Sequence, residues 1–198
     1  MFYIFVKYVI GPFILLFWRP RVINRKGLNI KGPAIFICNH ISMADPLLIA
    51  LIARRNIHYM AKKELFEKPI NRWFFKALFA FPINRSSADL ASLRNAMKLL
   101  DKGKVFGIFP EGKRAVTFEL DELENGAAFL AIRSGAPIVP MYIHPNSYRS
   151  HRPKVIVGET IHGREVVASI PRSEQAAALT AILESEMINI KGQLESTL

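Results

Sequence analysis

The chain has 198 residues, a hydrophobic fraction of 51% and a formal net charge of +11 at pH 7, which indicates one domain with a core large enough to bury a site. The mean hydropathy of +0.18 is low for a polytopic membrane protein, and the charge implies a polyanionic partner such as nucleic acid, an anionic membrane or a phosphorylated substrate. The single cysteine, Cys38, excludes an intrachain disulfide framework and a cysteine-rich zinc site, and it fits a reducing compartment.

The first element is an apolar, aromatic run over residues 1–17, in which Lys7 is the one charged residue. A spanning helix needs about 20 apolar residues, and Gly11-Pro12 should bend or break a helix. A signal peptide fits poorly, because no basic region precedes the run and no small-residue cleavage site follows it. A buried core helix is the remaining alternative. We favour an interfacial or re-entrant anchor on an anionic, cytoplasmic membrane face, because basic residues follow the run. These are Arg19, Arg21, Arg25 and Lys26.

After this segment, short apolar runs alternate with helical patterns, which is typical of an α/β sheet. The runs predict strands at residues 34–38, 57–60, 81–84, 105–109, 137–143 and 155–157. Helical spacing predicts helices at residues 46–53, 70–80, 89–100, 126–133 and 173–194. Gly135 is a plausible stop for the helix at 126–133, and Ser173 is expected to cap the last helix.

The segment NHISMADP directly follows the first of these strands, where an α/β fold presents a loop to its ligand. His40 can take up a proton near neutral pH, and a nearby carboxylate can hold its imidazole in the needed tautomer. Asp45 can supply that carboxylate if His40 lies in the loop and Asp45 opens the next helix. Asp45 before Pro46 fits an ordinary helix N-cap equally well, so both interpretations stay open.

A second polar segment, FPEGKR, follows the strand at 105–109. Its glycine, Gly112, permits close backbone approach to a ligand. Glu111 can accept hydrogen bonds from polyol hydroxyls, and Lys113 and Arg114 can bind phosphate. Taken alone, the segment is better described as a polar turn on the surface.

Three further segments are less specific. AKKELF spans residues 61–66, and FPINR ends at Arg85. The aromatic residues between them are expected either in the core or on a surface that dips into lipid. They are Trp73, Phe74, Phe75 and Phe79. PIVPM, at residues 137–141, frames an apolar run with two prolines, which shapes a strand edge or a pocket wall.

Together, these blocks resemble the lysophosphatidic acid acyltransferase family, the 1-acylglycerol-3-phosphate O-acyltransferases. The four matching blocks are NHISMADP, FPINR, FPEGKR and PIVPM, and their order and spacing fit from Gly32 to Ile143. The resemblance implies an α/β fold with a single mixed sheet flanked by helices. It also implies a membrane-associating segment over residues 1–26 and an acyltransferase catalytic domain over residues 27–198.

The resemblance further implies that His40, aligned by Asp45, deprotonates the 2-hydroxyl of 1-acylglycerol 3-phosphate. The hydroxyl would attack the thioester of acyl-CoA or acyl-carrier protein and give phosphatidic acid, with no acyl-enzyme, no metal and no further cofactor. Lys62 would stabilise the oxyanion. The residues that would hold the glycerol phosphate are Arg85, Glu111, Gly112 and Arg114.

The implied partners are a lysophospholipid, an anionic bilayer and acyl-carrier protein, with the protein peripheral or monotopic on the cytoplasmic face of the cell membrane. The alternatives are another lysolipid acceptor, glycerol 3-phosphate, or a non-catalytic basic membrane-binding protein. Nucleic-acid binding is permitted by the charge, but the sequence holds no recognisable motif for it.

Overall fold

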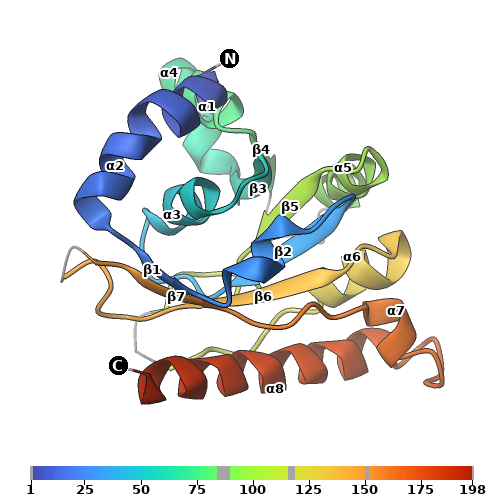
Figure 1. Ribbon diagram of the computed structural model, residues 1–198. Helices are drawn as coiled ribbons and strands as arrows, with labels where there is room; N and C mark the ends of the chain where they lie inside the picture. The colour runs from blue at the N-terminus through green and yellow to red at the C-terminus, as the bar shows by residue number, and fades with distance from the viewer. Residues whose placement is uncertain (1, 84–89, 116–118, 150–151, 198) are drawn as a thin grey trace.

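The computed structural model describes residues 2–83, 90–115, 119–149 and 152–197. A sheet runs through the middle of the molecule with helices on both faces (Figure 1). Its strands are β1 (Arg21–Ile23), β2 (Ala34–Cys38), β3 (Ile57–Lys62), β4 (Ala80–Ile83), β5 (Val105–Ile108), β6 (Ile138–Ile143) and β7 (Lys154–Val157). The α-helices are α1 (Phe2–Phe5), α2 (Gly11–Trp18), α3 (Asp45–Ile52), α4 (Pro69–Ala77), α5 (Leu90–Asp101), α6 (Gly126–Ser134), α7 (Gly163–Val166) and α8 (Gln175–Ser196). A π-helix, η1 (Val6–Ile10), and two 3₁₀ helices, η2 (Arg25–Asn29) and η3 (Lys63–Phe66), complete the set.

The seven strands form one sheet in the order β1-β7-β6-β2-β5-β3-β4. Strands β6 and β7 pair antiparallel, and every other neighbouring pair is parallel. Every residue of β2 is buried, as expected for a central strand covered on both faces. The single mixed sheet flanked by helices is therefore confirmed.

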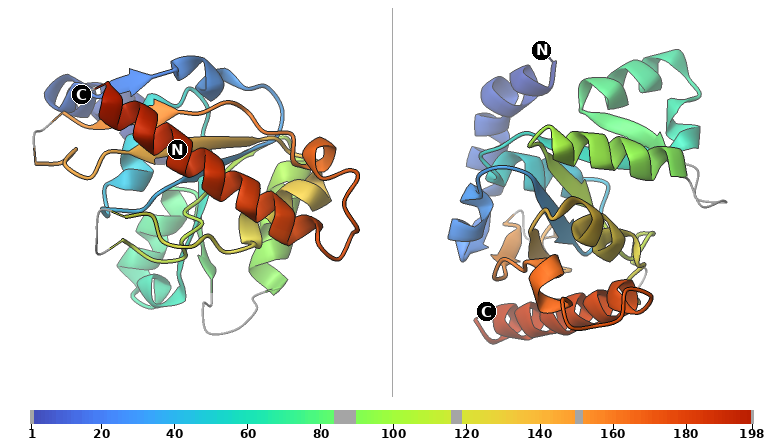
Figure 2. Two further views of the ribbon diagram at one scale, coloured as in Figure 1. Left: turned by 90° about the horizontal axis from the view of Figure 1, so that it is seen from below. Right: turned by 90° about the vertical axis from the view of Figure 1, so that its right-hand side faces the viewer.

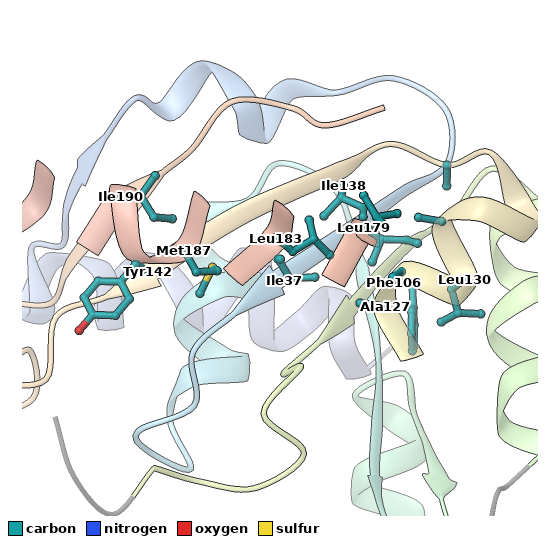
Figure 3. Close-up of a cluster of buried hydrophobic side chains, with 14 of the residues drawn as sticks. Ile37, Phe106, Ala127, Leu130, Ile138, Tyr142, Leu179, Leu183, Met187 and Ile190 are labelled. Carbon is teal, nitrogen blue, oxygen red and sulfur yellow. The ribbon is translucent and has the colours of Figure 1, made fainter. Parts of the chain in front are cut away.

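One face of the sheet is covered by α5, α6 and α8, and Figure 2 shows α8 lying across the strands. Helix α8 buries a stripe at helical spacing that includes Leu179, Leu183 and Met187. Figure 3 shows these side chains packed near strand residues such as Ile37 and Phe106. On the opposite face, residues of α3 and η2 pack against the alternate side chains of the same strands.

The expected cap of α8 is wrong. The helix begins at Gln175, and the preceding residue, Glu174, makes no side-chain cap hydrogen bond. A turn closed by the Glu174 amide and the Pro171 carbonyl, 2.9 Å apart, occupies the position where Ser173 was expected to cap. The Gln175 side chain donates instead to the carbonyls of Val167 and Ile170. Gly135, by contrast, ends α6 in the left-handed conformation, as expected.

The N-terminal segment is helical from residue 2 to residue 18, so the break expected at Gly11-Pro12 does not occur. The helix passes through a π turn, in which the Gly11 amide bonds to the Val6 carbonyl. Pro12 then lies at the start of α2, where a missing N–H costs little. Among the residues that the structure describes, no helix is both long and apolar enough to cross a membrane.

One stripe of this segment docks on the domain. Tyr3, Lys7 and Gly11 are buried at a spacing of four residues. The Ile57 amide donates to the Tyr3 hydroxyl over 3.1 Å, and Lys7 donates to the Arg55 carbonyl over 2.7 Å. Burial lowers the pKa of Lys7 to about 8, because the charged form loses its hydration. The polar side-chain atoms of Tyr3 and Lys7 therefore point toward the protein.

The remaining surface of the segment is apolar and exposed. We call it the N-terminal apolar face: Ile4, Phe5, Tyr8, Val9, Ile10, Phe13, Leu16 and Phe17. The N-terminal helices lie beside α4 (Figure 1), where the Phe2 and Trp73 rings are 5.1 Å apart. An exposed apolar patch of this extent is uncommon on a soluble monomer and marks an interaction surface.

The aromatic residues of the α4 region divide between the two alternatives left open by the sequence. Phe75 contacts Phe66, with ring centroids 5.5 Å apart, and Phe79 stacks on Tyr3 at 4.6 Å. These two half-buried residues pack against other aromatic rings of the protein. Trp73 and Phe74 are 60% and 42% exposed and extend the N-terminal apolar face.

Candidate active site

The sequence blocks meet because five neighbouring strands, β6, β2, β5, β3 and β4, are parallel. The carboxyl ends of parallel strands lie at one edge of a sheet, where α/β proteins bind their ligands. His40 follows β2, Glu111 follows β5 and Lys62 ends β3. Arg85, which follows β4 in the sequence, lies outside the described residues.

His40 and Asp45 form a hydrogen-bonded pair at this edge. The His40 Nδ1 and Asp45 Oδ2 atoms are 2.8 Å apart, and the two side chains are 13% and 0% exposed. An aspartate on Nδ1 fixes the imidazole tautomer with its proton on that nitrogen. The second nitrogen, Nε2, is then the one that can accept a proton from a substrate.

Asp45 is held from several directions. Its Oδ2 also accepts from the backbone amides of Ile41 and Ser42, each over 2.7 Å, and its Oδ1 accepts from the Tyr148 hydroxyl over 2.7 Å. Helix α3 begins at Asp45, with Ala44 in the cap position and no side-chain cap. The N-cap interpretation is therefore wrong, because the carboxylate points back to the His40 loop rather than into the first turn of α3.

The His40 ring is also fixed by packing. It stacks on Phe109 with ring centroids 4.1 Å apart and an interplanar angle of 20°. Asn39 exchanges two hydrogen bonds with the backbone of Ile143, of 2.9 and 2.7 Å, which tie the end of β2 to the end of β6. The Ala115 amide donates to the His40 carbonyl over 2.7 Å. The position of His40 is therefore fixed by residues at the ends of β2, β5 and β6.

A cavity of about 630 Å³ opens beside the pair. Its walls are mostly apolar and come from the N-terminal segment, α3, β3 and α4. His40 lines it, as do Lys62, Lys113 and Arg114, which are exposed cations. The cavity combines room for a long apolar group with positive charge near the histidine, a composition that suits an amphiphilic anion.

Comparison with known proteins identifies the family. The profile of the family described as Acyltransferase matches residues 19–144. A 1-acyl-sn-glycerol-3-phosphate acyltransferase of Bacillus subtilis is 34% identical over 184 residues, which cover 88% of this chain and 89% of that protein. The chain belongs to the acyltransferase family.

Two further matches are more distant. A chloroplastic 1-acyl-sn-glycerol-3-phosphate acyltransferase of Arabidopsis thaliana is 30% identical over 125 residues, which cover 60% of this chain and 35% of that protein. The crystal structure of the acyltransferase PlsC from Thermotoga maritima aligns with a TM-score of 0.64 and 17% identity, over 92% of this chain and 80% of that one. The structural likeness shows that the two chains share a fold.

The acyltransferase loop after β5 places a carboxylate against the histidine backbone. Glu111 is buried, and its Oε1 accepts from the His40 amide over 3.2 Å. Its Oε2 is buried without a hydrogen-bond partner among the described residues. Burial raises the pKa of Glu111, because desolvation disfavours the charged form. The Asp121 backbone favours the charged form in part, and Glu111 is not among the residues that line the cavity.

The remaining predicted positions have distinct places. Gly112 takes a φ of +67° and shapes the turn, and a side chain there would collide with Glu124. Arg114 and Lys62 line the cavity. Lys113 also lines it and pairs with Asp121 over 3.3 Å. Sequence reasoning missed Tyr148, because no motif marks it and it lies 103 residues from the carboxylate it contacts.

Proposed function

We propose that this acyltransferase transfers a fatty acyl group from a thioester donor, acyl-CoA or acyl-carrier protein, to the 2-hydroxyl of 1-acylglycerol 3-phosphate. The observation that carries the proposal is the His40–Asp45 pair, 2.8 Å apart, at the wall of an apolar cavity that exposed cations also line. Relatives named for this acceptor support the substrate.

In the proposed reaction, the acceptor hydroxyl gives its proton to His40 Nε2 as its oxygen attacks the thioester carbonyl. Asp45 would stabilise the imidazolium that forms, and Lys62 would stabilise the oxyanion. The carbon–sulfur bond then breaks, and the departing thiolate takes the proton back from His40. The products are phosphatidic acid and a free thiol. No acyl-enzyme forms, and the residues perform the chemistry without a metal or a further cofactor.

The glycerol phosphate would lie against the loop after β5. Arg114 and Lys113 offer positive charge to the phosphate, and Arg85 is proposed as a third cation. Glu111 Oε2, which lacks a partner among the described residues, would accept a hydrogen bond from the glycerol part. Gly112 would let the backbone come close to the ligand.

The acceptor is tested by incubating the purified protein with a panel of lysolipids and glycerol 3-phosphate, each with acyl-CoA and with acyl-carrier protein as donor. Mass spectrometry identifies the acylated products. We expect 1-acylglycerol 3-phosphate to be converted with the highest kcat/KM. Faster conversion of a different lysolipid would replace the acceptor, and no acylation of any acceptor would favour a non-catalytic membrane-binding protein.

Glu111→Gln should raise the KM for the acceptor about tenfold and leave the KM for the thioester nearly unchanged. A hydrogen bond to a charged group is worth about 1.5–3 kcal/mol, and the amide keeps the shape of the side chain while losing its charge. Steady-state kinetics with each substrate varied in turn give both constants. Glu195→Gln, on the exposed side of α8, is the matched control. Equal weakening of both substrates would show that Glu111 is structural.

We also propose that the protein binds an anionic, cytoplasmic membrane surface through the N-terminal apolar face. The exposed part of α4 continues this face, and both the N-terminal segment and α4 contribute walls to the cavity. A lipid acceptor would therefore reach the cavity from the bilayer. The basic residues after the segment would add attraction to anionic lipid.

Phe13→Ser combined with Phe17→Ser should reduce binding to anionic vesicles by at least about tenfold. These side chains are 72% and 66% exposed, so the fold loses little, while burial of each aromatic in lipid is worth roughly 1.5–3 kcal/mol. Co-sedimentation measures the bound fraction. Phe129→Ser on α6, at 42% exposure, is the control on a distant helix. If the double variant sediments like the wild type, the membrane contact lies elsewhere.

A further inference from the structure

The catalytic carboxylate has two oxygens, and the proposed reaction accounts for one of them. Asp45 Oδ2 accepts from His40 and from two backbone amides. The other oxygen, Oδ1, accepts from the Tyr148 hydroxyl over 2.7 Å. Because Asp45 is fully buried, the tyrosine takes the place that water would occupy at an exposed carboxylate. The orientation of the carboxylate is therefore set jointly by the His40 loop and by the loop after β6.

Several hydrogen bonds hold the described residues of the loop that carries Tyr148. The His144 amide donates to the Lys154 carbonyl over 3.0 Å. The Lys154 amide donates to the Ser147 hydroxyl over 3.0 Å. The Ser147 amide also donates to the His144 carbonyl over 2.9 Å. At the base of the loop, the Asn39 side chain exchanges two hydrogen bonds with the backbone of Ile143. Hydrogen bonds within the described part of this loop, residues 144–149, and to Lys154 therefore hold the tyrosine beside Asp45.

The Tyr148 ring is braced from the side by Trp18. The two rings meet edge to face, with centroids 5.8 Å apart and an interplanar angle of 68°, a favourable geometry for an aromatic pair. Trp18 is the last residue of α2. The contact therefore connects the end of the N-terminal helices to Tyr148, which donates to the Asp45 carboxylate. Both side chains pack against the core cluster beneath α3.

We propose that Tyr148 is a positioning residue of the reaction, which holds Asp45 in line with His40 and is itself held by Trp18. This inference rests on the proposed role of His40 as general base. Tyr148 does not line the cavity, and it acts on the histidine through the carboxylate. Its hydroxyl withdraws some of the negative charge of Asp45, because a hydrogen bond to a charged acceptor stabilises that charge.

The sign of the effect follows from this charge. Without the tyrosine hydroxyl, more negative charge remains on Asp45, and the protonated imidazole of His40 is stabilised. Removal of the hydroxyl should therefore move the His40 titration midpoint to higher pH. Burial raises the pKa of Tyr148 well above its ordinary value, so the phenol stays a donor throughout the working range.

Other ionisable groups lie near the pair, and Cys38 also interacts electrostatically with Tyr148. The ionisable groups that face Asp45 and His40 from the neighbouring elements are Cys38, Tyr59, Lys62, Glu111, Lys113 and Arg114. None of them bonds to Tyr148 in the described part of the chain. A shift seen in a Tyr148 variant therefore reports the lost hydroxyl.

The test compares Tyr148→Phe with Tyr142→Phe and the wild type. Tyr142 is buried on β6, in the core cluster on the opposite face of the sheet, so its variant also loses one hydroxyl. NMR titration of ¹³C-labelled histidine follows His40, whose signal is assigned by its absence from His40→Ala. We expect the midpoint to rise by about one pH unit in Tyr148→Phe alone, since one unit corresponds to 1.36 kcal/mol and a hydrogen bond is worth about that much.

Kinetics give the second readout. The acidic limb of kcat/KM should move to higher pH by the same amount, so that kcat/KM measured on the acidic side of the limb should fall about tenfold. Trp18→Leu should move the limb in the same direction by less, with the midpoint of thermal unfolding recorded for each variant. An unchanged His40 midpoint in folded Tyr148→Phe overturns the proposal. A wild type that acylates no lysolipid would remove the proposed function, while the His40 titration would still decide the role of Tyr148.

Discussion

Replacing His40 with alanine should lower the rate of acyl transfer by about 10²–10⁴-fold, the range that a positioned general base contributes. The imidazole is the group that the structure holds between Asp45, at 2.8 Å, and the stacked ring of Phe109. The substitution removes the proton acceptor and leaves the strands that form the core intact. Initial rates of phosphatidic acid formation, measured by mass spectrometry, give the loss directly.

His162→Ala is the control for this variant. His162 precedes α7, and its side chain is 56% exposed next to Glu165. We expect it to retain wild-type activity. Thermal unfolding of both proteins shows whether the fold is preserved. A folded His40→Ala protein that turns over at the wild-type rate would remove His40 from the mechanism.

Asp45→Asn should reduce transfer by a similar factor, about 10²–10⁴-fold, and it should also destabilise the fold. The amide has no charge to stabilise the imidazolium and has one oxygen where the carboxylate uses two. Four hydrogen bonds end on Asp45, and one mismatched donor in a buried site costs about 1–3 kcal/mol. Rates are compared at a temperature where circular dichroism shows the variant folded.

The two losses should not multiply. Since Asp45 acts through His40, the double variant should be about as slow as His40→Ala alone. Measurement of all four rates in one double-mutant cycle checks this. Independent, multiplicative losses would show that Asp45 contributes to catalysis by a route other than His40.

Most strands of the sheet could be predicted from sequence because buried strands consist largely of apolar residues. Residues Ala34–Cys38 form β2 as predicted, because a central parallel strand is apolar throughout. Strand β1, with three residues, is too short for its pattern to stand out, and it forms because it pairs with β7. The 3₁₀ helix η2 that follows β1 was likewise not predicted.

The N-terminal segment shows where pattern reasoning ends. An amphipathic helix is expected to bury its apolar side, yet here Lys7 and the hydroxyl of Tyr3 face the protein and large apolar residues face outward. Hydropathy alone cannot give this orientation, because it depends on acceptors and donors that β3 and the preceding loop happen to leave unpaired. The helix also continues through Gly11-Pro12 because a π turn accommodates the proline.

The site was predictable where a motif follows a strand. His40, Glu111 and Lys62 could be placed together once the strands were taken as parallel, since parallel strands end at one edge. The role of Asp45 was ambiguous, because an aspartate before a proline fits a helix cap as well as a catalytic partner. Tyr148 could not be found, since its contact with Asp45 joins residues 103 positions apart in the sequence and no motif marks it.

The most direct test of acyl transfer by His40 is a paired measurement of products. Wild-type protein and His40→Ala are incubated with 1-acylglycerol 3-phosphate and an acyl thioester that carries a different chain, and free thiol and phosphatidic acid are quantified in the same samples. We expect one phosphatidic acid per thiol with the wild type, carrying the donor chain at position 2, and almost none with His40→Ala. Thiol released without phosphatidic acid, or equal product from both proteins, would contradict this mechanism.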